Sequence, residues 1–332
     1  MATGALVPSE LTSVGVALQT TKGTPVTATN FLRVTSVKPQ QNIPYLPDNS
    51  FQGDMAKVHD EIQGPTSVAL ELGGNLYADE IGWALASLLG DLTVTGTQDP
   101  YDTTFSLLNS NQGQTSYYTY TYWNGSDGLE FVDCKCNELS LSYTASGLVT
   151  VDSKWDGISA TTTTQPTTSY ASTRAQPAWR ATVSINSLTG PLVTDISLDI
   201  KRTNIPVAAM QSTSAQPVAD IFNAGDLDFT GSATVVYDAT NGSTIYGYFT
   251  AGTIVPIVVD LAVTESSKAH EVKFTTTQAL ITQATLQPAN ANYVSMAIQF
   301  EGIANTTDVG ASGGRAPVQA ITKAGLASGT YA

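Results

Sequence analysis

The sequence predicts a mainly β protein, an antiparallel β-sandwich or barrel with one flanking α-helix and long loops. Charged residues are only 13% of the 332-residue chain, so Ser, Thr, Asn and Gln supply much of its polarity. Segments rich in Thr, Val and Tyr are separated by Gly, Asn and Asp, which is the composition of strands and turns. A chain of this length can bury a large core without disulfides or a metal.

Alternation between apolar and polar residues marks the expected strands. In one segment Ile196, Leu198 and Ile200 share a face opposite polar residues, which predicts one buried and one solvated face, as in antiparallel sheets. Asn-Gly pairs at 124–125 and 241–242 are typical of tight turns. We expect strands at residues 67–72, 116–123, 129–144, 147–155, 179–188, 194–202, 227–238, 244–250, 257–264, 270–275 and 293–301.

One helix is expected, over residues 76–89. Asn75 is a suitable N-cap, and Gly90 is a typical C-terminal glycine. The spacing of the apolar residues places them on one helical face. That face consists of Tyr77, Ile81, Leu85 and Leu88.

Aperiodic and low-complexity segments divide the chain. Residues 154–158 and 299–303 both read aromatic, acid, Gly, Ile near the end of a strand, which indicates two related β modules. Three prolines within residues 31–64 favour a long loop after a short strand. The expected organisation is an N-terminal arm at 1–30, a β-sandwich domain at 31–303 with modules at about 31–159 and 179–303 joined by a Thr-rich loop at 160–178, and a C-terminal tail at 304–332.

The chain is acidic, with 14 Lys plus Arg against 28 Asp plus Glu and a net charge of −14. Because nucleic-acid affinity depends on cations that neutralise phosphates, this balance argues against tight DNA or RNA binding. It suits a surface that must not hold DNA. Residues 1–10 lack the pattern of a signal peptide, and no apolar run approaches the length of a membrane span. We therefore expect a soluble protein made in a cytoplasm.

No catalytic, metal or cofactor site is expected. His59 and His270 lie in no nucleophile motif and are expected at the surface, and Cys134 and Cys136 are expected to be free thiols on one face of a strand. The sequence contains no phosphate-binding loop and no zinc-binding pattern. Asp226 and Asp228 would lie within about 7 Å on one strand face, a separation that retaining glycosidases use. Acids two apart are routine on a solvated strand, so we do not predict catalysis there.

Five aromatic residues gather within residues 117–123, and three interpretations of them stay open. They could belong to the core, to a subunit interface, or to a sugar-binding platform, and we rank the core first. Base stacking is disfavoured because no basic residues lie nearby.

The block from Gln63 to Asp91 resembles the tail tube, or major tail, proteins of long-tailed, siphophage-like bacteriophages. In that family a strand leads into one short helix that ends in Leu-Gly, as Leu89-Gly90 does here, and the rest is β-sandwich. The strand endings Trp155-Asp156-Gly157 and Phe300-Glu301-Gly302 are also similar. The resemblance covers the order of elements over most of the chain, although the Thr-rich loop and the C-terminal tail lie outside the core of that fold.

The resemblance implies a structural protein, not an enzyme, that assembles into rings, commonly of six copies, which stack into the tail tube of a virion. Two modules in one chain would also allow a ring of three. The tube would conduct the genome through an acidic, DNA-repelling lumen, with Asp226 and Asp228 as candidate lining residues. Partners would be copies of the chain and other tail proteins, namely the tape measure, tail terminator and distal tail protein, with no membrane and no cofactor. Synthesis would take place in the host bacterial cytoplasm. The alternatives are a carbohydrate-binding adhesin and another virion structural protein, such as a capsid decoration protein.

Overall fold

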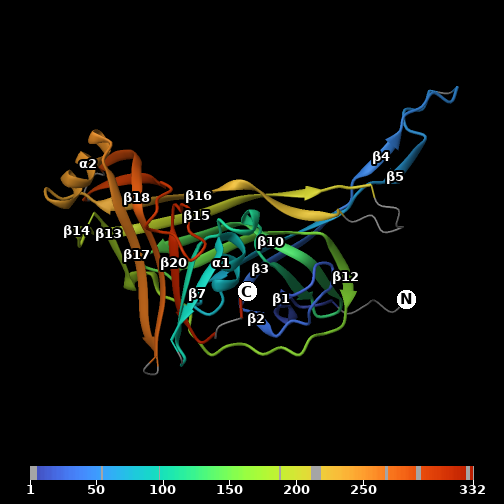
Figure 1. The fold of residues 1–332 in the computed structure, drawn as a ribbon, viewed down its shortest axis with the longest axis horizontal. Helices are drawn as coiled ribbons and strands as arrows, with labels where there is room; N and C mark the ends of the chain where they lie inside the picture. Colours follow the sequence, from blue (N-terminus) through green and yellow to red (C-terminus); the bar gives the residue numbers. More distant parts are fainter. Residues whose placement is uncertain are drawn as a thin grey trace.

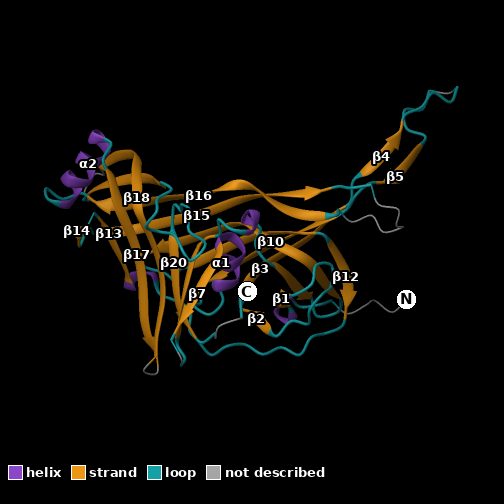
Figure 2. Ribbon diagram, viewed as in Figure 1, coloured by secondary structure: helices purple, strands orange, loops and turns teal. Residues whose placement is uncertain are grey.

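Antiparallel strands dominate the computed structural model, which describes residues 6–53, 55–96, 98–186, 188–210, 218–265, 268–288, 293–326 and 330–331 (Figures 1 and 2). The predicted fold class is confirmed. The helices are α1 (Gly82–Leu89) and α2 (Asn241–Ala251), with short 3-10 turns η1 (Ser9–Leu11), η2 (Asn111–Gly113) and η3 (Ala178–Arg180). The strands are β1 (Ser13–Gln19), β2 (Asn30–Leu32), β3 (Val34–Asn42), β4 (Tyr45–Asp48), β5 (Asp60–Gln63), β6 (Ser67–Asn75), β7 (Gly90–Thr95), β8 (Tyr101–Leu107), β9 (Tyr117–Trp123), β10 (Gly128–Thr144), β11 (Thr150–Gly157), β12 (Ser159–Thr163), β13 (Ala181–Ile185), β14 (Leu188–Thr189), β15 (Val193–Val207), β16 (Asp220–Val236), β17 (Ile254–Glu265), β18 (Lys268–Pro288), β19 (Val294–Gly302) and β20 (Gln319–Ala324).

Eight strands form what we call the main sheet, paired in the order β3-β6-β11-β10-β15-β16-β19-β18. The first half of β18 leaves this sheet and pairs with β17 and β20, which continue to β13 and β8. The first half of β10 likewise pairs with β9 and β12. Because β10 and β18 each belong to two sheets, the sheets close over one core that contains most of the buried apolar residues.

Helix α1 begins six residues later than the sequence predicts, although Gly90 ends it as expected, with φ 80°. The N–H of Leu76 donates to the carbonyl of Val149, which keeps the start of the predicted helix extended. Arg33 then holds Glu80, because its backbone N–H donates to the Glu80 carboxylate at 3.0 Å. The predicted Asn75 cap is therefore wrong. All eight residues of α1 are buried.

A second helix lies where the sequence predicts a tight turn and a strand. Asp238 decides this outcome, because its carboxylate accepts hydrogen bonds from the backbone N–H groups of Thr240 and Gly242 at 2.8 and 3.4 Å. Such bonds satisfy the free N–H groups at a helix start. Helix α2 follows and buries Ile245, so the predictions of a tight turn at 241–242 and a strand at 244–250 are wrong.

The segments expected to be irregular carry several strands. Strand β1 lies within the expected arm and is almost entirely buried between β2 and β9, and β20 lies within the expected tail. The expected loop at 31–64 instead contains β3 at an edge of the main sheet and a projecting hairpin, β4–β5. The Thr-rich segment is irregular from residue 164 to 176, as predicted. The division into an arm, two modules and a tail stays a prediction.

Tyr331, near the C-terminus, is part of the core and not of a loose tail. Its ring lies 5.1 Å from that of Trp83 and 5.8 Å from that of Phe105, and its carbonyl accepts a hydrogen bond from Tyr118 at 2.7 Å. Gly82 starts α1 directly against this ring, where an added Cβ would lie 2.3 Å from the Tyr331 Cζ. The first turn of α1 is thus shaped to receive a side chain from the far end of the sequence.

Tyr331→Ala is therefore expected to lower the free energy of unfolding by about 3–5 kcal/mol, the usual cost of deleting a buried aromatic ring. Urea unfolding followed by tryptophan fluorescence measures this loss. Tyr45→Ala is the matched control, because Tyr45 is 59% exposed and its removal should change stability by less than about 0.5 kcal/mol. Equal urea midpoints for the two variants would contradict the assignment of Tyr331 to the core.

Candidate functional site

A row of six charged side chains crosses the solvent-facing side of the main sheet, which we call the outer face. Each residue lies directly opposite the next in the strand register, and the signs of the charges alternate. Opposite charges across neighbouring strands stabilise their pairing. This charge ladder consists of Lys38 on β3, Glu71 on β6, Lys154 on β11, Glu138 on β10, Lys201 on β15 and Asp228 on β16.

Glu138 is the centre of the charge ladder. Its carboxylate oxygens lie 2.7 Å from Lys154 Nζ and 3.1 Å from Lys201 Nζ, so one acid joins three strands. The hydrogen bond from Lys154 lowers the pKa of Glu138, and the bond from Lys201 acts in the same direction. Lys38 lies 2.8 Å from Glu71 and lowers its pKa in the same way. The ladder is electrically neutral, since three lysines face three acids.

A second row, next to the ladder, is acidic and contains no lysine. We call Asp152, Asp199 and Glu301 the acid row. Strand register connects them through Ser140 and Thr230, which lie between them on β10 and β16. Asp199 accepts a hydrogen bond from Ser140. The outer face therefore combines a neutral row with one of charge −3.

Asp226 and Asp228, the two residues selected from the sequence, are both exposed on the outer face of β16. Asp228 ends the charge ladder opposite Lys201, so its charge has a counterpart. Their place in a lumen stays a prediction. Sequence reasoning did not select the acid row, because its members are far apart in the chain and only the strand register brings them together.

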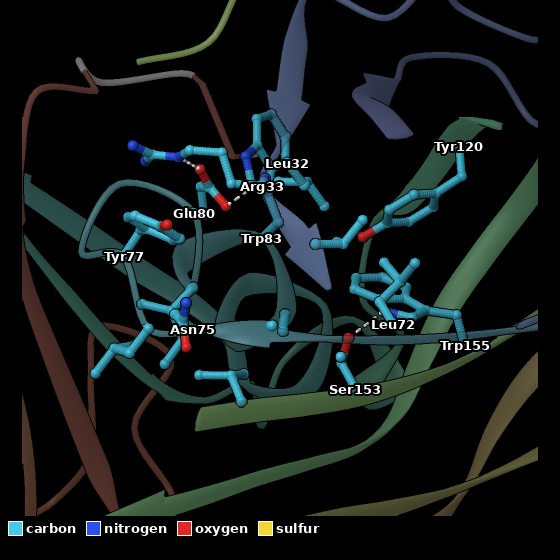
Figure 3. A pocket seen from close by; sticks show the side chains of 17 residues that line it. Leu32, Arg33, Leu72, Asn75, Tyr77, Glu80, Trp83, Tyr120, Ser153 and Trp155 are labelled. Carbon is cyan, nitrogen blue, oxygen red and sulfur yellow. Dashed lines mark hydrogen bonds and ion pairs between the residues drawn. The ribbon is translucent and has the colours of Figure 1, made fainter. Parts of the chain in front are cut away.

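A small cavity lies beside α1, and Figure 3 shows the side chains around it. Its volume is about 60 Å³, and Leu32, Leu72 and Trp155 contribute to its apolar wall. Arg33 lies 3.6 Å from the centroid of the Tyr77 ring and pairs with Glu80, whose pKa is nevertheless raised by burial. Such a volume accommodates a few water molecules, whereas ligand pockets are several times larger.

The remaining polar candidates are structural. Cys134 and Cys136 are free and buried, as expected, and burial raises the pKa of both thiols, which disfavours reactivity. His270 is only 5% exposed, so the expectation of a surface histidine is wrong there, because β18 turns this side chain inward. Within the described ranges, no three His, Cys, Asp or Glu residues are grouped to hold a metal.

The aromatic segment of β9 belongs mainly to the core. Tyr118 and Tyr120 are fully buried, and their rings lie 5.9 and 4.7 Å from that of Trp155. A sugar-binding platform needs exposed ring faces, so these two tyrosines do not form one. The interpretation ranked first from the sequence is confirmed for them.

A broad polar sheet face suits a structural subunit, and the family comparison agrees. A protein-family model described as phage tail tube protein matches residues 9–320. The chain belongs to the phage tail tube protein family. A search of curated proteins gave no match.

As a tail tube protein, the chain is a structural component of the phage tail, which places it in the virion. This family is not known for enzymatic activity, and its members associate with themselves and with other tail components. In the described part of the chain, no helix is long and apolar enough to cross a membrane.

The tail tube protein also exposes apolar side chains at one end. The β4–β5 hairpin projects from the body, opposite the end that carries α2 (Figure 1). Leu46 and Ile62 lie opposite each other across the hairpin and are 56% and 59% exposed. Phe51 and Met55, between the two strands, are fully exposed. An isolated two-stranded hairpin is marginally stable in water, so a covering surface would stabilise this one.

Glu138→Gln should lower stability by about 0.5–1 kcal/mol at pH 7, a range that allows for solvent around the half-exposed lysines. The pKa of Glu138 is lowered in the folded state, so its contribution is present above the ordinary glutamate pKa and is lost as pH falls through the lowered value. The difference from the unmodified protein should therefore disappear in acid.

Urea unfolding at pH 7 and at about pH 3 tests the contribution of Glu138. Glu301→Gln is the control, since the described residues offer Glu301 no ion pair, and it should change stability little at either pH. A Glu138→Gln effect that persists unchanged at the lower pH would contradict the ion-pair explanation.

Proposed function

We propose that this tail tube protein assembles into closed rings that stack into the channel for genome passage, and that the outer face of its main sheet lines that channel. The observation that carries the proposal is an eight-stranded sheet in which each end strand has a free edge. Strand β3 pairs only with β6, and residues 281–288 of β18 pair only with β19, within the described chain. Joining such edges between copies removes them, as in a barrel.

The main sheet supports the proposed division into two modules. Its first four strands, β3-β6-β11-β10, and its last four, β15-β16-β19-β18, follow the same order of connection. A helix comes after the second strand of each set: α1 follows β6, and α2 follows β16. The similar endings Trp155-Asp156-Gly157 and Phe300-Glu301-Gly302 fall on the corresponding strands β11 and β19.

Strand irregularities recur at corresponding places in the two sets. Between β3 and β6 the register shifts between Val34 and Ser36, and between β15 and β16 it shifts between Val193 and Asp195. A second shift separates Cys136 from Glu138 on β10, and its counterpart separates Ile281 from Gln283 on β18. Bulges are specific features of a strand pair, so two coincidences of this kind support a repeated unit.

Three copies would supply six modules to one ring, and we propose this number. Three main sheets form a barrel of about 24 strands, whose diameter between opposite backbones is about 45 Å at ordinary strand spacing and tilt. Porins with 16–18 strands already enclose an aqueous channel. Six copies would double the diameter to about 90 Å.

The acid row supports a channel that does not hold DNA. Asp152, Asp199 and Glu301 add negative charge to a face that also carries Asp226, and the charge ladder beside them is neutral. Such a surface offers the DNA phosphates no excess of positive charge, so its affinity for DNA would be low. Asp226 and Asp228 remain proposed lining residues, with Asp228 compensated by Lys201.

The β4–β5 hairpin suits contact between stacked rings. It carries exposed apolar residues at one end of the long axis of the molecule, directly beyond the end of β3 (Figure 1). At the ends of the tube we expect the tape measure, tail terminator and distal tail proteins as partners.

Negative-stain microscopy of the concentrated protein tests this proposal, and we expect rings and hollow tubes. Replacing Tyr45, Leu46 and Ile62 by Ser should leave rings but shorten or abolish tubes, because the apolar hairpin surface is lost. Asp60→Ser with Glu61→Ser changes the same hairpin without removing apolar area and should leave the tubes intact. A protein that stays monomeric at high concentration would overturn the proposed function.

Charge reversal tests the lining. Tubes of a variant with Asp152→Lys, Asp199→Lys and Glu301→Lys should bind short duplex DNA at low salt and shield it from nuclease, with binding that falls steeply as salt rises. The control places Lys at Asp60, Glu61 and Asp127, outside the outer face. DNA held by the control tubes should stay open to nuclease. Equal digestion in both variants would show that the acid row does not face the channel.

A further inference from the structure

We propose that copies join by pairing β18 of one with β3 of the next, in the register that β10 and β15 use inside the chain. This inference rests on the proposed ring and specifies the contact that closes it. Strands β10 and β18 occupy the fourth place in their modules, and β15 and β3 the first. The β10–β15 pair is therefore an internal example of a fourth strand joined to a first strand.

The bulges fix the correspondence between the two modules. The shift after Cys136 on β10 matches the shift after Ile281 on β18, so Glu138 corresponds to Gln283. The shift after Val193 on β15 matches the shift after Val34 on β3. Counting along each strand from these points converts every β10–β15 pair into a predicted pair between copies.

The resulting register pairs residues 283–288 of β18 with residues 42–37 of β3 in the neighbouring copy, and four of these pairs can be compared with their internal equivalents. Within the chain the corresponding pairs are Glu138 with Lys201, Ser140 with Asp199, Leu141 with Leu198, and Ser142 with Ser197. The predicted pairs between copies are Gln283 with Asn42, Thr285 with Gln40, Leu286 with Pro39, and Gln287 with Lys38.

Side-chain chemistry agrees with this register. Gln283, Thr285 and Gln287 would meet Asn42, Gln40 and Lys38 on the outer face, where no like charges oppose each other. Leu286 lies on the other face and is 43% exposed, although its counterpart Leu141 is 1% exposed. Pro39 of the next copy would cover Leu286, as Leu198 covers Leu141.

The stagger of the strands also fits a closed ring. The strand pairing leads across the sheet from Lys38 on β3 to Lys201 on β15. By the matched bulges, however, the residue of β15 that corresponds to Lys38 is Ser197, four residues before Lys201. The chain thus shifts by four residues over four strands, or one residue per strand. An eight-stranded barrel with a shear of eight has the same ratio and tilts its strands by about 36°. Repeating the internal junction therefore generates the strand tilt of ordinary barrels.

Both free edges carry features of strands that must not pair at random. Proline is tolerated in edge strands, and Pro39 is central in β3 while Pro288 ends β18. Lys38 adds a charge to the same edge. Such residues limit pairing with unrelated strands.

Disulfide trapping tests the register in assembled tubes. Gln40→Cys with Thr285→Cys should form a disulfide between copies, because facing residues in antiparallel strands lie within the Cα separation that a disulfide needs. Gln40→Cys with Gln283→Cys is the matched off-register pair on the same face, at a diagonal distance of about 7–8 Å, and should form little. The native Cys134 and Cys136 are buried and should not interfere.

Non-reducing gels of tubes first confirmed by microscopy give the readout, and the bands should end at three linked chains. Ser140→Cys with Asp199→Cys is the internal equivalent and should close within one chain, which shows that this register supports a disulfide. Preferential linking of the off-register pair, or no linking of either pair in intact tubes, overturns the inference. Absence of rings from the unmodified protein overturns the proposed function instead, and bands up to six chains would revise only the ring size.

Discussion

The pairing of β10 with β15 is the interaction on which the rest of the structure depends. It joins the two four-stranded halves into one main sheet over seven consecutive residue pairs. Leu141 and Leu198 lie opposite each other in this junction and are at most 1% exposed, and burial of such side chains contributes about 1.5–3 kcal/mol each. Without this junction the charge ladder would be divided after Glu138, and the outer face would no longer be continuous.

The charge ladder specifies how these strands are aligned. A shift of one residue would turn every side chain of a strand to the opposite face, which burial already forbids. A shift of two residues keeps the faces but moves Lys201 from Glu138 to Ser140, so the ion pair at 3.1 Å would be lost. Surface ion pairs add little stability individually. Here the ion pairs favour one strand alignment over others that keep the same apolar face toward the core.

Sequence patterns predicted the features set by local chemistry and missed those set by distant partners. The end of α1 at Gly90 was predictable because a left-handed glycine is a local requirement. Its start was not, because Arg33, some fifty residues earlier, binds Glu80. At α2 two local signals competed, and the Asp238 cap prevailed over the Asn-Gly turn pattern. The exposure of Asp226 and Asp228 followed from alternation, whereas the acid row depended on register across several strands.

A chain with two modules makes the two kinds of junction in the proposed ring unequal. The junction within the chain pairs leucine with leucine and Glu138 with Lys201, and it forms whenever the protein folds. The junction between copies would pair Leu286 with Pro39 and neutral amides with each other, so it offers less apolar burial and no ion pair. Forming the junction between copies would also cost the translational and rotational entropy of association. The internal junction does not carry this cost, because its two strands belong to one chain. Free copies would therefore stay folded with their edges unpaired at low concentration, and rings would form as the protein is concentrated.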